Sequence, residues 1–143
     1  MATSFDIIID QGLIAVDDYR LAKLYNQSQD NFQMFCDGLL IRAVPNFTLC
    51  RQSISYDTTT REFVSDFTDL EVSILADYWA IEWMTRYVQN SAQFQAKLQT
   101  SGSFRNFSEA QNLKEKASYL DGMREKVSQK ETNYQLQDID SLL

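Results

Sequence analysis

The chain has 143 residues, of which 44% are apolar and 13% aromatic, enough to build the core of one domain. Its formal charge of −7 leaves neither half of the chain with the basic surface that sequence-independent DNA binding requires. No stretch is apolar over the roughly 18 residues of a membrane-spanning helix, and the acids within MATSFDIIID argue against a signal peptide.

The sequence offers no recognisable arrangement of residues for a common catalytic site. There is no histidine, which removes the commonest general base and the nucleophile pairs that depend on it. Cys36 and Cys50 are isolated among apolar neighbours, so we expect reduced thiols and no zinc site. No glycine-rich phosphate loop occurs either. We therefore expect no catalytic residue, metal or cofactor, with an enzyme that uses carboxylates alone as an alternative.

The first third of the chain predicts one clear helix. Residues 1–16 fit either a short helix or a strand, because helical spacing competes with three consecutive β-branched isoleucines. Residues 28–44 predict a helix that ends before Pro45. Its apolar face consists of Phe32, Phe35, Cys36, Leu39, Leu40 and Ala43. Residues 46–66 are expected to be irregular, with a loop or short hairpin at YDTTTREF.

The stretch FTDLEV carries the strongest local signal in the sequence. Thr68 and Glu71 have the spacing of a capping box, and Phe67 and Val72 have the spacing of a hydrophobic staple. A helix is therefore predicted over residues 68–90, and after the polar break at Asn90 the residues Phe94 and Leu98 predict either a short helix or an extension of the long one. Its apolar and aromatic side chains form two stripes, too wide for one partner helix. Either this is the central helix of its own domain, or part of it meets another subunit.

A second long helix is predicted over residues 108–131. Ser108 and Gln111 form another possible capping box. Apolar residues follow at the spacing of a coiled-coil seam, so the helix should pack antiparallel on the helix 68–90. Its charged residues, of both signs, indicate a solvated outer face. The seam residues are Leu113, Ala117, Leu120 and Val127, with Arg124 interrupting them.

The last residues, 132–143, are short, polar and acidic, with apolar side chains at the very end. Such a segment is either disordered or becomes ordered on a partner. The sequence thus predicts an all-α fold, a small helical bundle of residues 1–131 followed by an extended C-terminal arm, 132–143.

The second half of the chain contains a succession of motifs that resembles a known family. The motifs are a helix start at residues 66–71, Glu82-Trp83 near the middle of an aromatic helix, a polar break at Asn90, an apolar segment at 94–98, and FSEAQNLK at 107–114. Over residues 66–128 the chain resembles the head–tail adaptor (connector or neck) proteins of tailed bacteriophages, particularly those of phages that infect Gram-positive bacteria.

The resemblance implies a structural virion protein that is made in the host cytoplasm and resides at the head–tail interface. Such proteins form a homo-oligomeric ring, usually twelvefold, beneath the portal protein. The ring joins the portal to a downstream neck or tail protein and lets DNA pass without reading its sequence. A terminal arm grips the portal. The alternatives are another neck or tail layer, such as a stopper, or a small acidic phage regulator that binds a host protein.

On this interpretation, particular side chains have particular roles. We expect Trp79 and Trp83 to anchor the long helix against helices 28–44 and 108–131. The full set of expected core anchors is Trp79, Trp83, Leu75, Ile81, Leu113 and Leu120. The side chains expected to contact a neighbouring subunit or partner are Tyr78, Arg86, Tyr87, Tyr134, Ile139, Leu142 and Leu143.

Overall fold

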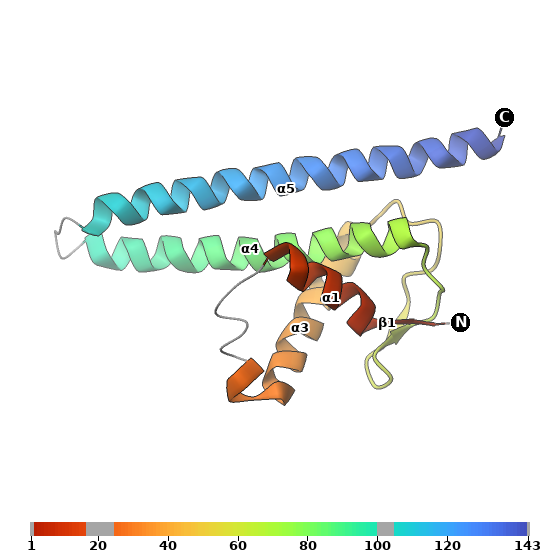
Figure 1. The fold of residues 1–143 in the computed structure, drawn as a ribbon, viewed down its shortest axis with the longest axis horizontal. Coiled ribbons are helices and arrows are strands. Elements are labelled where there is room, and N and C mark those ends of the chain that lie inside the picture. The colour runs from red at the N-terminus through yellow and green to blue at the C-terminus, as the bar shows by residue number, and fades with distance from the viewer. Residues whose placement is uncertain (1, 17–24, 100–104, 143) are drawn as a thin grey trace.

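The computed structural model describes residues 2–16, 25–99 and 105–142. The described part is mostly helical, which confirms the predicted all-α bundle. The helices are α1 (Phe5–Val16), α3 (Gln29–Ala43), α4 (Asp69–Gln99) and α5 (Arg105–Leu142), with a 3-10 turn η1 (Val44–Asn46); residues 25–27 are helical too. Helix α4 lies in the middle, with α5 antiparallel along one side and α1 and α3 on the other (Figure 1).

A small antiparallel sheet closes one end of the body. Its strands are β1 (Thr3–Ser4), β2 (Tyr56–Asp57) and β3 (Glu62–Phe63), in the order β1-β3-β2. The β2–β3 hairpin lies within YDTTTREF, as predicted. Asp57 Oδ1 accepts a hydrogen bond from Thr59 N (2.8 Å), and this bond shapes the turn. The ambiguous segment 1–16 combines both options, because strand β1 leads directly into helix α1.

Helix α3 begins and ends where the sequence predicts. The side chain of Ser28 accepts a hydrogen bond from Asn31 N (3.2 Å) and caps the first turn. Pro45 lies in η1 and stops the α-helical pattern after Ala43. Four residues of the predicted apolar face are buried in the core: Cys36, Leu39, Leu40 and Ala43.

Helix α4 begins with the predicted capping box. Thr68 N donates to Glu71 Oε1 (2.8 Å), and Glu71 N donates to Thr68 Oγ1 (3.3 Å). Both staple residues, Phe67 and Val72, are buried. The predicted end at residue 90 is wrong, and the alternative of an extension through Phe94 and Leu98 is confirmed, because α4 continues to Gln99. A polar residue such as Asn90 lowers helix propensity by less than about 1 kcal/mol, too little to stop a helix that lies along α5.

Helix α5 is longer at both ends than the sequence predicts. It is already helical at Arg105, so Ser108 lies inside the helix and is not its N-cap. It continues to Leu142, so residues 132–142 are not an extended arm. The reason is a seam of buried side chains, Leu120, Val127 and Tyr134, which repeats every seven residues beyond the expected end.

Charged residues between these seam positions conceal the continuation of α5 in the sequence. Lys130 Nζ lies 2.6 Å from Asp77 Oδ2 and donates to Ser73 Oγ (2.8 Å), both on α4. Glu131 accepts a hydrogen bond from Tyr78, also on α4. These partners let polar side chains lie at a half-buried helix interface. A run that resembles the solvated end of a helix is therefore part of the α4–α5 contact.

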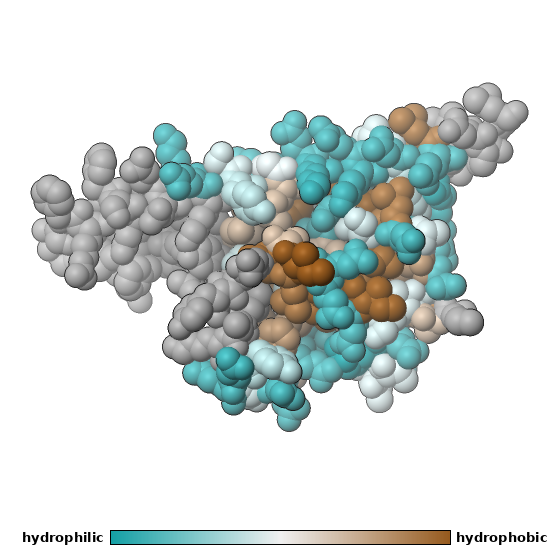
Figure 2. Space-filling view, viewed as in Figure 1, coloured by the Kyte–Doolittle hydropathy of each residue, from teal (hydrophilic) through white to brown (hydrophobic). Residues whose placement is uncertain are grey.

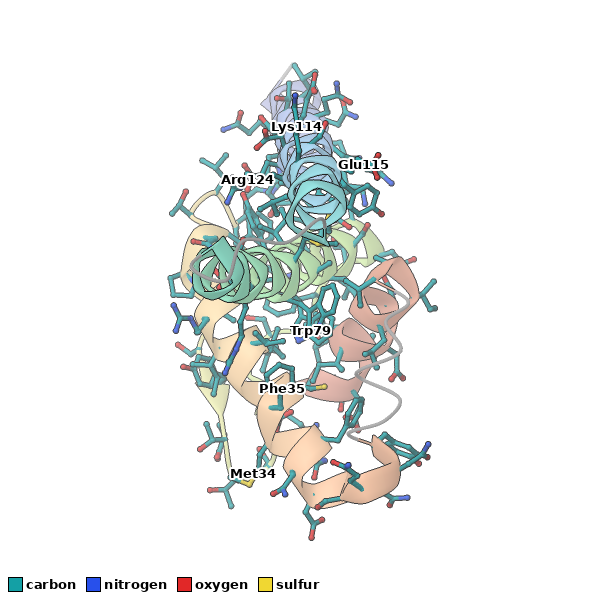
Figure 3. The ribbon with its side chains drawn as sticks, turned by 90° about the vertical axis from the view of Figure 1, so that its left-hand side faces the viewer. Met34, Phe35, Trp79, Lys114, Glu115 and Arg124 are labelled. Atoms are coloured by element: carbon teal, nitrogen blue, oxygen red, sulfur yellow. The ribbon has the colours of Figure 1, made fainter. Side chains whose placement is uncertain are left out.

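Trp79 lies at the centre of the core. Its side chain is fully buried and points from α4 toward the space between α1 and α3 (Figure 3). Its Nε1–H donates to the carbonyl of Cys36 on α3 (3.0 Å), and its ring packs on Gly12 of α1. The expected partner α3 is confirmed, and α1 is a partner that the sequence did not predict.

The predicted core anchors are buried wherever their side chains are described. Trp79, Trp83, Leu75, Ile81 and Leu120 all belong to the core, which confirms those assignments. The side chain of Leu113 lies outside the described part of the structure.

Candidate interaction surface

Among the residues that the structure describes, Glu71 is the most buried charged group, and both of its carboxylate oxygens are hydrogen bonded inside the chain. Oε1 accepts from Thr68 N and from Gln52 Nε2 (2.6 Å), and Oε2 accepts from Tyr134 Oη–H (2.8 Å) and Cys50 Sγ–H (3.6 Å). Burial alone would raise the pKa of Glu71, but hydrogen bonds from Thr68, Tyr134 and Gln52 outweigh it and lower the pKa. Glu71 is thus a satisfied structural carboxylate.

Tyr134 joins the C-terminal part of α5 to this cluster. Its hydroxyl oxygen accepts from Arg51 N (2.9 Å), and Arg51 Nη1 donates back to the Tyr134 carbonyl (3.1 Å). The guanidinium carbon of Arg51 lies 3.9 Å from the centre of the ring. Burial, with a contribution from Glu71, raises the pKa of Tyr134 to about 12, so the phenol keeps its proton. The prediction that Tyr134 contacts a partner is wrong, because its side chain is buried in its own subunit.

A second polar cluster centres on Arg61, at the end of the β2–β3 turn. Its guanidinium contacts both carboxylate oxygens of Asp37 (2.8 Å each) and one of Asp6 (2.8 Å). The hydrogen bonds to Asp37 are the main cause of the raised pKa of Arg61. Arg61 has a backbone φ of 57°, the left-handed region that residues in tight turns adopt. This cluster ties the hairpin to α3 and α1.

Both polar clusters join separate elements of the fold, so their role is structural. Within the described ranges, no group of three or more His, Cys, Asp or Glu side chains is arranged to hold a metal ion. Both cysteines are free thiols: Cys36 is buried and Cys50 is half-buried. Burial is the main cause of the raised pKa of each thiol.

Two isoleucines stand exposed on the outer side of α1. Ile7 is 49% exposed and Ile14 is 80% exposed. They are seven residues apart, which places them on the same face of the helix. Asp10 and Gln11, also exposed, lie beside them. Figure 2 shows this face, where the most hydrophobic side chains gather over α1 and hydrophilic ones cover α5.

A groove opens beside the C-terminal end of α1, between α1, α4 and α5. Its volume is about 570 Å³. Tyr119 and Met123 supply its aromatic and apolar walls, and Gly122 leaves it open because a Cβ there would meet no atom within 4 Å. The lining residues are Ala15, Asp77, Glu115, Ser118, Tyr119, Gly122, Met123 and Lys126. We call Ile7, Ile14 and these lining residues the α1–α5 surface.

The outer face of α5 is charged and solvated, as predicted. Lys114, Glu115 and Arg124 are exposed at different positions around α5 (Figure 3). Arg124 lies 3.6 Å from Asp121 in an exposed ion pair, which contributes little to stability. Lys130 and Glu131 differ from these residues, because both are half-buried and paired with side chains of α4.

Of the remaining predicted contact residues, the structure describes the side chains of Tyr78 and Arg86. Tyr78 is half-buried and donates to Glu131; burial, with Glu131 adding, raises its pKa. Arg86 is exposed, and its guanidinium lies 5.2 Å from the ring centre of Phe35. Tyr87, Ile139 and Leu142 lie on helices, but their side chains fall outside the described part, as does all of Leu143.

The exposure of Ile7 and Ile14 was not predicted from the sequence. The signal that identifies them is the pattern of α1, whose opposite face already carries Phe5, Ile8, Ile9 and Gly12. With one face of the helix filled by these residues, the two other isoleucines are left in solvent. Their exposure follows only once segment 1–16 is known to be helical.

Comparison of the chain with protein-family models, curated proteins and solved structures gave no match. Among the helices that the structure describes, none combines the length and apolar character of a membrane span.

Proposed function

We propose that this chain is a structural virion protein of a tailed phage, a head–tail adaptor that forms a ring beneath the portal. The proposal rests on the position of the adaptor-like motifs in the structure. The motifs at residues 66–128, which resemble those of adaptor proteins, fall on α4 and on α5 up to its middle. These two helices form the long axis of the molecule and extend together past α1 and α3 (Figure 1).

The exposed surface supports an assembly role. A ring of identical subunits needs two different patches on each copy, one for each neighbour. The α1–α5 surface joins two exposed isoleucines to an open groove, whereas exposed apolar residues on a monomer are usually scattered. The net charge of −7 suits a ring that lets DNA pass without holding it.

We assign the contact with the portal to the last turns of α5, beyond Tyr134. The resemblance implies that a terminal segment grips the portal. Tyr134 is the last buried side chain of α5 that the structure describes, and Leu136, two residues further on, is 52% exposed. The contacting segment is therefore a projecting helix end and not an extended arm.

The test uses the portal protein encoded beside this chain. The two purified proteins are mixed and their association is followed by analytical ultracentrifugation. The full chain is expected to sediment with the portal, and a chain that lacks residues 136–143 is expected to lose this association. The deletion leaves Tyr134 and its hydrogen bonds in place, so the body should stay folded.

A full chain that stays free of the portal while it is well folded would contradict the adaptor assignment. The chain would then belong to another neck or tail layer, or bind a host protein. Circular dichroism of the shortened chain checks that a lost association does not arise from unfolding.

A further inference from the structure

A pocket of about 270 Å³ opens between α1 and the N-terminal half of α3. Its lining comes from residues 6–13 of α1, from residues 25–36 before and within α3, and from Arg61 at the end of the β2–β3 turn. We call it the α1–α3 pocket. Sites for drug-sized molecules have volumes of roughly 300–1,000 Å³, so this smaller pocket suits a single side chain better than a whole ligand.

The deeper part of the α1–α3 pocket is apolar. Ile9 and Cys36 are almost completely buried there, and Leu13 and Phe32 are half-buried. Cys36 is a free thiol, and its side chain has no hydrogen-bond partner among the residues that the structure describes. Such a floor can cover the methylene stem of a long side chain while the charged end of that side chain stays near the rim.

An aromatic pair stands at the outer edge of the pocket. Tyr25 is 47% exposed, and its ring centre lies 5.3 Å from that of Phe32 in an edge-to-face arrangement. Gln29 Nε2 donates a hydrogen bond to Tyr25 Oη (3.3 Å), which orients the exposed ring. The face of an aromatic ring attracts a cation. An oriented, exposed tyrosine beside a pocket is therefore suited to a positively charged group.

The rim of the pocket carries an excess of negative charge. Asp6, Asp10 and Asp30 are exposed there, and Arg61 is the only basic residue of the described lining. The guanidinium of Arg61 is already engaged by Asp37 and Asp6 (2.8 Å each). Within the described ranges, the side chains of Asp10 and Asp30 have no hydrogen-bond or ion-pair partner. Two carboxylates at the rim are therefore left without a counter-charge, and a cationic group would complement them.

We propose that the α1–α3 pocket receives a basic side chain of a partner protein, with the guanidinium of an arginine as the best fit. The methylene stem lies on the apolar floor, the guanidinium faces Tyr25, and Asp10 and Asp30 accept its hydrogen bonds. A guanidinium suits this combination better than an ammonium, because its plane stacks on aromatic rings and its donors form a fork. Ile7, 49% exposed on α1, offers an apolar contact to the residues that flank the arginine.

This site is separate from the portal contact that we assign to the last turns of α5. Helix α5 lies on the opposite side of α4 from α1 and α3 (Figure 1). The proposal therefore goes beyond the adaptor function and does not depend on it.

The test is an NMR titration of the isotope-labelled full chain with three compounds. They are N-acetyl-arginine methylamide, its neutral analogue N-acetyl-citrulline methylamide, and spermidine, a free polyamine. The titrations are repeated with Asp10→Asn, because Asp10 is exposed in the middle of α1 and Asp30, in the first turn of α3, also stabilises its helix. The matched control is Glu125→Gln, which removes the same charge from an exposed position on α5.

The proposal predicts that the arginine compound shifts the amide signals of residues 6–13 and 25–36 most, and that the citrulline compound shifts them far less. Asp10→Asn should weaken binding of the arginine compound several-fold, whereas Glu125→Gln should leave it nearly unchanged, and added salt should weaken it. A circular dichroism spectrum like that of the parent chain shows that Asp10→Asn is folded.

Three results would overturn the proposal. They are equal or absent binding of the arginine and citrulline compounds, equal effects of the two substitutions, and shifts spread over the whole surface. Tighter binding of spermidine than of the arginine compound would overturn it too, because the pocket would then serve a free polyamine. No portal protein is present in these titrations, so a failure here leaves the adaptor function untouched.

Discussion

The contact between Gly12 and Trp79 gives the sharpest prediction of the fold, because two known effects of one substitution oppose each other. Replacing Gly12 by alanine inside a helix improves helix propensity by about 1 kcal/mol. The added Cβ, however, would lie 2.5 Å from Cε3 of Trp79 and 3.0 Å from its Cδ2. Those atoms belong to a rigid ring that is fully buried and hydrogen bonded to α3, so it has no room to move aside.

Overpacking a core by one carbon costs about 1–3 kcal/mol. Subtracting the gain in propensity, we expect Gly12→Ala to lower the free energy of unfolding by up to about 2 kcal/mol. The chain contains two matched controls. Gly38 in α3 and Gly122 in α5 are helical and exposed, and a Cβ on either meets nothing within 4 Å. Alanine at these positions is expected to raise stability by about 0.5–1 kcal/mol.

The assay is urea denaturation followed by circular dichroism for the parent chain and the three alanine variants. The reasoning is refuted if Gly12→Ala stabilises the chain as much as Gly122→Ala does. A double-mutant cycle locates the cause: in a Trp79→Phe background, where the ring is smaller, the cost of Gly12→Ala should shrink. An unchanged cost would show that the strain does not come from the indole.

Three further predictions follow from the polar clusters and the thiols. Tyr134→Phe removes the hydroxyl shared by Glu71 and Arg51 and should lower the free energy of unfolding by about 1–3 kcal/mol; a neutral result in urea denaturation would contradict the cluster's role. Because the pKa of Glu71 is lowered in the folded chain, its carboxylate contributes stability above the unfolded-state pKa of about 4, and this stability is lost as pH falls through the folded-state pKa. Glu71→Gln should therefore make the free energy of unfolding depend less on pH at acidic pH. An unchanged dependence on pH would contradict the role of Glu71. Burial, with Asp37 adding, raises the pKa of Cys36 to about 12, so mass spectrometry should find it unlabelled by iodoacetamide at pH 8 until the chain unfolds, and rapid labelling of folded protein would disprove this.

Local signals in the sequence predicted local structure well. The capping box at Thr68 and Glu71 and the end of α3 before Pro45 depend on residues a few positions apart, and both are confirmed. The buried tryptophan Trp79 was predictable for the same reason, because helical spacing alone identifies the apolar stripe of α4.

The errors arose where the deciding partners lie far away in the chain. The end of α5 was placed too early because Lys130 and Glu131 resemble a solvated terminus, whereas Asp77 and Tyr78 on α4 pair with them. Tyr134 was assigned to an interface because its partner Glu71 is 63 residues distant. The α1–α5 surface was missed because it exists only after α1 has packed on α4.

The most direct test of the adaptor assignment is electron microscopy of the portal mixed with the full chain and, separately, with the chain that lacks residues 136–143. The assignment predicts a ring of added density beneath the portal for the full chain, and a bare portal for the shortened chain. A bare portal in both samples, with the full chain folded and in excess, would contradict it.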